Sequence, residues 1–310
     1  MSTLRQAAGD YLRLRRSLGF ELAVPGRMVE QFAAHLDALG VTHVSIDLAL
    51  AWATAPAGAA PYYHWLRLNA VRGFARYLHG IDVAHQVPPA DVLPREYHRR
   101  TPYLLSAAGI AALTDAAGQL RPALHAATYQ ALIGLMAVGG TRPREAISLD
   151  TSDVRLPGGV VTVHGKYGKT REILLHPSTT EVLAGYAQLV KHNFPHRDGT
   201  SFFVSVIGTP LNQRRVGYIF ARLAQQAGLH PRSPHCRATP MSLRHSFAVN
   251  TLISWYQAGV DVDTHLPLLS TWLGHVYPAD TYWYLSAAPE LLALAADRMT
   301  RLYNTPKEQP

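Results

Sequence analysis

The stretch GVVTVHGKYGKTREILL, residues 159–175, decides the fold class that we expect for this chain. Its two halves alternate β-branched or apolar residues with polar ones, and the connection between them contains Gly168. Alternation with a period of two residues predicts strands, and a short connection with a glycine predicts a hairpin. We therefore expect a small β-hairpin at this point of the chain.

Helical patterns surround the hairpin on both sides. Apolar residues recur at helical spacing at about 106–118 and 123–137, and more helices follow the hairpin, the last of them beginning at Pro289. An earlier group of helical segments lies at residues 3–17, 26–39, 45–54 and 62–79. The predicted fold class is mainly α with a small β-hairpin or sheet, an α+β arrangement.

A change in composition separates the two groups of helices. The segment VPPADVLPREYHRRTP, residues 87–102, is rich in proline and in basic side chains. Proline fixes φ and removes a backbone donor, which favours an extended connector. We predict a helical domain over residues 1–86, a basic linker over residues 87–102, and a larger domain with a C-terminal helix over residues 103–310.

Composition limits the classes of function. The chain has 310 residues, of which 48% are hydrophobic, and a formal net charge of +8. A folded basic protein favours an acidic partner, first nucleic acid and second an acidic membrane surface. We find no apolar run that would span a bilayer and no secretory signal. The single cysteine, Cys236, excludes a disulfide framework, and no histidines and carboxylates stand in metal-ligand spacing, so we expect a cytoplasmic protein without a metal.

The segment AVGGTRPREAISL, residues 137–149, contains a candidate anion site. Pro143 suits the first turn of a helix, where its missing N–H has no cost. Arg142 then lies at the start of that helix, and Glu145 stands in a capping-box position. A guanidinium group beside free backbone N–H groups binds anions. An ordinary capped helix with exposed arginines is the alternative.

A second candidate anion site lies in TPMSLRHSFAVNTL, residues 239–252, where Thr239 and Pro240 suit a helix start. Arg244 and His245 emerge near that start, although a surface salt bridge would also account for the arginine. A third lies at the hairpin turn, where a basic cluster either reaches a phosphate or is simply solvated. Its members are Lys166, Lys169 and Arg171.

Taken in order, these segments resemble the motifs of the tyrosine recombinases, the phage-integrase family of site-specific DNA recombinases. The family pattern has an arginine followed three residues later by a glutamate, as in TRPREAISL, and a lysine in a β-hairpin, as in HGKYGKTRE. A His-x-x-Arg-His box and a Leu-Gly-His follow, and a nucleophilic tyrosine stands nine residues after that last histidine. The N-terminal helices resemble the family's core-binding domain. The ending TYWYLSAAPELLALAADRM is similar to that of recombinases carried by transposons and other mobile elements.

The resemblance implies a set of catalytic residues: Arg142, Lys166, Arg244, His275 and Tyr284. Tyr284 would be the nucleophile, because it stands nine residues after His275, and Tyr282 would be its neighbour. Met241 departs from the pattern. It replaces the first histidine of the box, which in the family orients the phosphate and assists proton transfer. Because methionine can do neither, we expect slower cleavage than a histidine would give.

The resemblance also implies how the protein works. Such an enzyme cleaves and rejoins DNA through a covalent 3′-phosphotyrosyl intermediate, without a cofactor, to integrate, excise or transpose a mobile element. It would form a two-domain, C-shaped clamp on double-stranded DNA and a homo-tetramer on two DNA sites, alone or with partner recombinases, in the bacterial cytoplasm at the nucleoid. The expected DNA contacts are Arg67, Arg72, Arg76, Lys169, Arg171 and His245.

Three other interpretations stay open on the sequence alone. Met241 motivates the first, a family member that has lost catalysis and acts as a regulator or accessory subunit. The second is a type IB topoisomerase, which relaxes supercoils by the same tyrosine chemistry. The third is a basic helical adaptor, which requires every motif match to be coincidental.

Overall fold

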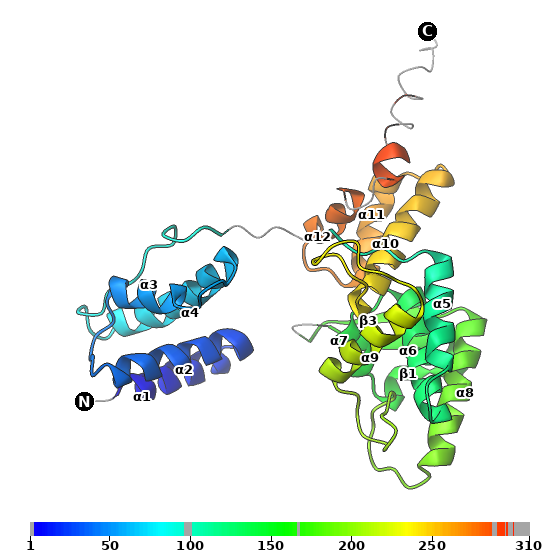
Figure 1. Cartoon of the computed structure of the whole chain (residues 1–310), viewed down its shortest axis with the longest axis horizontal. Helices are drawn as coiled ribbons and strands as arrows, with labels where there is room; N and C mark the ends of the chain where they lie inside the picture. The colour runs from blue at the N-terminus through cyan, green and yellow to red at the C-terminus, as the bar shows by residue number, and fades with distance from the viewer. Residues whose placement is uncertain are drawn as a thin grey trace. The chain divides into compact units, whose positions relative to one another are not determined.

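The computed structural model of the protein describes residues 3–95, 101–165, 168–286, 290–294, 296 and 300. The chain divides into two compact units, Met1–Arg99 and Arg100–Pro310, and each has its own apolar core (Figure 1). The chain is mainly helical with a small sheet, so the predicted fold class is confirmed.

Unit 1 is helical throughout its regular elements, and its helices pack around the fully buried side chains of Phe32, Leu36 and Phe74. Two of its helices begin where a hydroxyl side chain caps a backbone N–H, at Thr3 and Ser45. The helices of unit 1 are α1 (Leu4–Ser17), α2 (Ala23–Ala38), α3 (Ile46–Thr54) and α4 (Pro61–His79).

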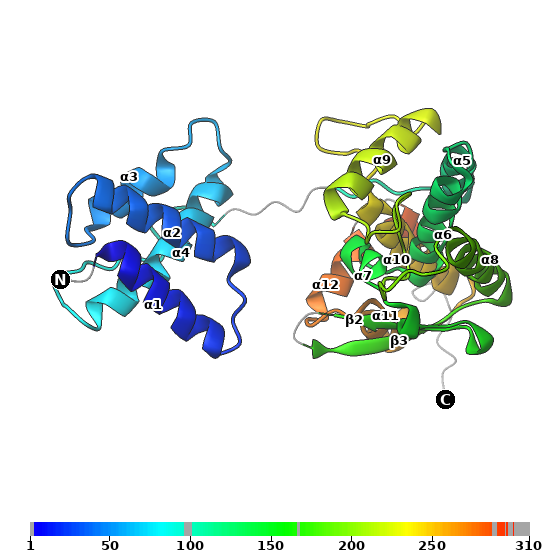
Figure 2. The ribbon, with the colours of Figure 1, turned by 90° about the horizontal axis from the view of Figure 1, so that it is seen from below.

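Unit 2 is built around one helix that has no polar face. Helix α6 (Ala123–Gly139) buries residues along its whole length, from Leu124 to Gly139. A helix that is apolar on every side must be enclosed, and Figure 2 shows α5, α8 and α10 gathered around α6. The enclosing helices are α5 (Ala107–Gly118), α8 (Pro177–Asn193) and α10 (Pro240–Gln257).

The sheet contains the predicted hairpin. Strands β2 (Val160–His164) and β3 (Thr170–Leu174) pair antiparallel, from Val160 opposite Leu174 to His164 opposite Thr170. Alternate side chains, among them Val161, Val163 and Ile173, are fully buried, as the period-two pattern predicts. A third strand, β1 (Val154–Arg155), pairs with β2 and was not predicted, because two residues are too short to show a period.

The end of unit 2 forms a smaller apolar cluster of its own, which contains Leu252, Leu273 and Tyr284. Of the helix expected from Pro289, residues 290–294 are helical and Leu291 is buried against this cluster, whereas Pro289 itself lies outside the described residues. The remaining elements of unit 2 are α7 (Pro143–Ile147), α9 (Gln213–Gln226), α11 (Val262–Leu273), α12 (Ala279–Tyr282) and 3₁₀ turns at Thr151–Asp153, Leu156–Gly158 and Trp283–Ser286.

Candidate active site

Two glycines with a left-handed backbone end the helices that meet at the site. Gly140 (φ 61°) follows α6, and Gly274 (φ 66°) follows α11. Glycine adopts a positive φ without steric cost, and this conformation turns the chain sharply out of a helix. The last carbonyl groups of a helix have no partner within it, so they are open to donors from elsewhere in the fold.

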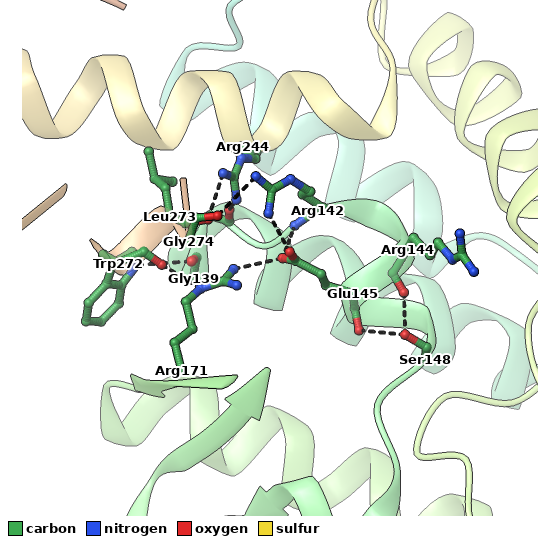
Figure 3. Close-up of polar contacts among 11 residues, drawn as sticks. Gly139, Arg142, Arg144, Glu145, Ser148, Arg171, Arg244, Trp272, Leu273 and Gly274 are labelled. Carbon is green, nitrogen blue, oxygen red and sulfur yellow. Dashed lines mark hydrogen bonds and ion pairs between the residues drawn. The ribbon is translucent and has the colours of Figure 1, made fainter. Parts of the chain in front are cut away.

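Arg244 uses the carbonyl groups of both helix ends. Its Nη1 donates to the Gly140 carbonyl over 2.8 Å. Its Nη2 donates to the Leu273 carbonyl, also over 2.8 Å (Figure 3). The residue is only 2% exposed. Burial, together with the positive charge of Arg142, lowers the pKa of Arg244 to about 10. The side chain is therefore still a cation at neutral pH.

Two further arginines bind the same end of α11 (Figure 3). Arg142 donates from Nη2 to the Gly274 carbonyl over 3.3 Å, and Arg171 donates from Nε to the Trp272 carbonyl over 2.7 Å. The C-terminal end of a helix carries a partial negative charge, which favours cations there. The end of α11 thus brings together arginines that lie far apart in the sequence.

Glu145 links two of these arginines to each other. Its carboxylate accepts from the Arg142 guanidinium over 2.6 Å, from the Arg142 backbone N–H over 2.9 Å and from the Arg171 guanidinium over 2.7 Å. The backbone contact confirms the predicted cap at the start of α7. Burial alone would raise the pKa of Glu145, but the hydrogen bonds and charges of Arg171 and Arg142 outweigh it and hold the pKa below its ordinary value.

The side chain of Tyr284 lies beside this group. Its hydroxyl is 3.1 Å from Nδ1 of His245, and its ring stacks on that of His275 with a centroid distance of 6.2 Å. Nδ1 of His275 in turn lies 2.7 Å from the hydroxyl of Thr281. A negative charge on Tyr284 would raise the pKa of Arg244, so the two groups are close enough to interact electrostatically.

The side chain of Tyr284 is almost inaccessible to solvent. The residue is 2% exposed and belongs to the apolar cluster at the end of unit 2. Contact with a bulky substrate therefore requires a displacement of the 3₁₀ turn Trp283–Ser286, which carries it.

The arrangement suits the binding of an anion. Three guanidinium groups and one carboxylate leave two net positive charges at the end of α11. The side chain of Arg142 is 31% exposed, whereas that of Arg171 is 11% exposed, so Arg142 is the group that a ligand meets first. A guanidinium group has five N–H donors in a planar fork, which matches the oxygens of a phosphate.

The other predicted residues of unit 2 lie in different settings. Met241 is half-buried in the first turn of α10, and Lys169 is exposed beside the hairpin turn, whereas Lys166 lies outside the described residues. Arg171 was expected on the hairpin tip as a DNA contact. It lies instead within β3, with its guanidinium turned inward to Glu145.

The arginines of unit 1 that were predicted to contact DNA lie in two different settings, one buried and one at a pocket. Arg67 is 8% exposed, donates to the Trp52 carbonyl over 2.7 Å and lies over the Trp52 ring, which does not fit the DNA contact that we expected of it. Arg72 and Arg76 line a pocket of about 330 Å³ together with Arg15. This pocket is rich in positive charge and lies entirely within unit 1.

Sequence reasoning missed two contacts of the site. Arg171 and Glu145 are 26 residues apart, and His245 and Tyr284 are 39 apart, so no local pattern reveals either pair. The helix-ending glycines did leave a signal, because a glycine directly after a helical stretch predicts a left-handed helix end.

Two features are absent from the part of the chain that the structure describes. Within it, no three histidine, cysteine or acidic side chains come together as a possible metal site. Nor does it contain a helix whose length and apolar character would let it cross a membrane.

Comparison with known proteins places the chain in a family. The model of the phage integrase family matches residues 105–290. A putative integrase/recombinase of Sinorhizobium fredii, y4rB, is 39% identical over 308 residues, which cover 97% of this chain and 98% of that protein. A tyrosine recombinase XerC of Azotobacter vinelandii is 31% identical over 231 residues, or 74% of this chain and 71% of that protein.

Among solved structures, the Tn1549 transposon integrase in complex with transposon right-end DNA matches with a TM-score of 0.64, covering 96% of this chain and 99% of that one. At 17% identity this likeness speaks for the fold alone. The family model and the full-length relative agree, and the chain therefore belongs to the phage integrase family, the tyrosine recombinases.

Proposed function

We propose that the protein is a DNA strand-exchange enzyme that cleaves and rejoins DNA through Tyr284. The integration, excision or transposition of a mobile element is the process that it serves. The observation that carries this proposal is the meeting of Arg142 and Arg244 at the end of α11, close to the Tyr284 phenol.

The arginines would bind the phosphodiester to be cleaved. Displacement at phosphorus concentrates negative charge on the non-bridging oxygens, and guanidinium groups that are already in place stabilise that charge. Arg244 is held by two carbonyl groups and Arg142 by Glu145 and Gly274, so neither has to be ordered when DNA binds. His275 would add a hydrogen bond to the same phosphate.

Tyr284 would attack the phosphorus atom. The attack forms a 3′-phosphotyrosyl bond and releases a free 5′-hydroxyl, with Lys166 as the proton donor to the leaving oxygen. A phenol has an ordinary pKa of about 10, so it needs positioning and nearby positive charge to react at neutral pH. The covalent bond conserves the energy of the phosphodiester, and rejoining therefore needs no nucleotide cofactor.

Contacts away from the reacting phosphate would hold the DNA. Arg15, Arg72 and Arg76 in the pocket of unit 1 and the exposed Lys169 in unit 2 are suited to backbone phosphates. Strand exchange between two duplexes requires a nucleophile for each strand, which favours a homo-tetramer on two DNA sites.

The test is covalent trapping. A nicked suicide substrate loses a short fragment after cleavage, so the protein should stay attached to DNA in SDS. Replacement of the nucleophile, Tyr284→Phe, should abolish this complex. Tyr282→Phe, at a neighbouring phenol that is 50% exposed, should leave it intact. A complex that survives in Tyr284→Phe and disappears in Tyr282→Phe would assign the wrong tyrosine.

A further inference from the structure

His245 lies against the phenol that the proposed function uses. Its Nδ1 is 3.1 Å from the Tyr284 hydroxyl, which is hydrogen-bond distance. The His245 ring also meets the Trp283 ring edge to face, with centroids 5.5 Å apart. The imidazole of His245 lies on helix α10, which packs against the 3₁₀ turn that carries Tyr284. It therefore contacts two neighbouring rings of that turn.

Attack by a phenol requires a group that takes its proton. The ordinary pKa of a phenol is about 10, and that of an imidazole is about 6.5, so a neutral histidine can accept a proton that is moving off the oxygen during attack. The guanidinium groups of Arg142 and Arg244 are cations with donors only and cannot accept it. Nδ1 of His275 is engaged with Thr281. His245 places a ring nitrogen at hydrogen-bond distance from the reacting oxygen.

The departure at Met241 makes this placement significant. Met241 and His245 are four residues apart on α10, so they lie on the same face of the helix, one turn from each other. The methionine stands where the family pattern has a histidine that assists proton transfer. The chain keeps the second histidine of the box, His245, one turn further along the same face, and its Nδ1 lies 3.1 Å from the Tyr284 hydroxyl.

We propose that His245 is a catalytic residue, the general base for Tyr284. The phenol proton passes to Nδ1 of His245 as the phenolic oxygen bonds to phosphorus. The bond from phosphorus to the 5′-oxygen breaks, and this oxygen takes a proton from Lys166. In rejoining, the 5′-hydroxyl returns its proton to Lys166 and attacks phosphorus, and the departing phenolic oxygen recovers its proton from the His245 imidazolium. The proposal rests on the proposed function and assigns it one further group.

Two substitutions separate proton transfer from hydrogen bonding. In His245→Asn, the amide oxygen takes the place of Nδ1 and still accepts a hydrogen bond from the phenol, but it cannot take up the proton. In His245→Ala, both abilities are removed. We expect both variants to form the trapped complex roughly 10²–10⁴ times more slowly than the unaltered protein, which is the usual contribution of a general base. The melting temperature should change little in His245→Asn.

His192→Asn is the matched control, because His192 is exposed on α8, which lies away from α10. It should cleave at the unaltered rate. Trapping by the unaltered protein tests the proposed function in the same experiment, so a loss confined to His245 variants bears on His245 alone.

A substrate with sulfur in place of the 5′-bridging oxygen identifies the step. A thiolate leaves without a proton because the ordinary pKa of a thiol is about 8.5, far below that of an alcohol. The slow cleavage of Lys166→Ala should recover on this substrate, whereas that of His245→Asn should persist. Equal recovery of the two variants would place His245 at the leaving group and overturn the proposal. The proposal would also be overturned if His245→Asn cleaved at the rate of the unaltered protein, or if His245→Ala cleaved faster than the unaltered protein.

Discussion

A single carboxylate holds two of the site arginines in their positions. Glu145 is 8% exposed and accepts hydrogen bonds from both Arg142 and Arg171. Without it, two buried or half-buried cations would face each other with no counter-charge. At the scale of one residue, the site therefore needs the negative charge of Glu145 as well as the positive charges of its arginines.

Glu145→Gln should reveal this balance through the pH dependence of stability. The pKa of Glu145 is lower in the folded protein than its ordinary value, so the folded state binds this proton less readily than the unfolded state does. Its contribution is complete above a pH of about 4.5 and is lost as the pH falls through the lower folded pKa. In urea unfolding at pH 7, the variant should be less stable by about 2 kcal/mol.

The gap between Glu145→Gln and the unaltered protein should close in acid. Glu172→Gln is the control, since Glu172 also pairs with an arginine, Arg155, but its side chain is 59% exposed. It should change stability by less than about 1 kcal/mol at either pH. A gap that is equal at pH 7 and pH 3 would show that the charge of Glu145 does not contribute.

Met241→His should restore the family pattern at the one position where the chain departs from it. A histidine in the first turn of α10 would lie one turn before Arg244 and could donate to the bound phosphate. We expect trapping to become at least about tenfold faster, as befits one cooperating group. Met241→Leu, which fills similar space and can neither donate a hydrogen bond nor exchange a proton, is the control. An unchanged rate in Met241→His would show that the chain does not need this histidine.

At the scale of elements, the site depends on where helices end. Helices α6 and α11 both stop at a glycine with positive φ, and their last carbonyl groups then bind Arg244. One left-handed residue at each helix end therefore determines the position of a guanidinium group. A change of backbone there should affect both folding and the site.

Gly140→Ala should be strongly destabilising for this reason. A Cβ atom at Gly140 would lie 2.5 Å from Cδ1 of Phe247, and the φ of 61° is strained for any residue with a side chain. Strain and overpacking together should lower the free energy of unfolding by about 3 kcal/mol. Gly134→Ala, in the middle of the same helix and with no atom near its added methyl group, should raise it by up to about 1 kcal/mol. Thermal melts of the two variants that moved in the same direction would contradict this account.

The elements themselves were largely predictable from the sequence. A period of two indicates the hairpin and a long apolar stretch indicates helix α6, and both are local signals. Helix α2 begins three residues earlier than expected, at Ala23, because Pro25 is tolerated in a first turn that has no N–H partner to lose. The contacts of the site were not predictable. Arg244 and Gly140 are 104 residues apart, and only the tertiary fold brings them together.

The identity of the site residues came from the order of motifs rather than from any physical pattern. Arg142, Arg244, His275 and Tyr284 do lie close together through the end of α11, the contact with Gly274 and the stacking of the two rings. Their catalytic roles remain predictions. Arg67 and Arg171 were expected to contact DNA, but in the structure both side chains turn inward and bind backbone carbonyl groups.

At the scale of the whole molecule, each of the two units offers positive charge for DNA. Replacement of Arg72 and Arg76 by alanine should weaken binding to DNA of any sequence, because phosphate contacts carry no base information. Log affinity decreases with log salt concentration, and the magnitude of this slope should decrease by about one for each phosphate that the variant no longer binds. Titrations at several salt concentrations measure both quantities.

Two other arginines of unit 1 serve as controls for that measurement. Arg5 has the same charge and a side chain that is 64% exposed, but it lies outside the pocket, so Arg5→Ala should leave the salt slope unchanged. Arg67→Ala should lower the melting temperature instead, because it removes a buried contact with Trp52. An equal decrease of the slope in all of these variants would mean that the pocket has no special part in binding.

The packing of Tyr284 among apolar side chains has a consequence for the genome that houses such a protein. If Tyr284 is the nucleophile, as proposed, uncovering a ring of this size would cost about 2 kcal/mol and would leave roughly one copy in thirty ready to react at any moment. A stray collision with a chromosome is therefore mostly harmless. On the proposed mechanism, only a duplex that stays bound for many such openings would be cut, so long residence at the correct sequence would protect the host from accidental strand breaks.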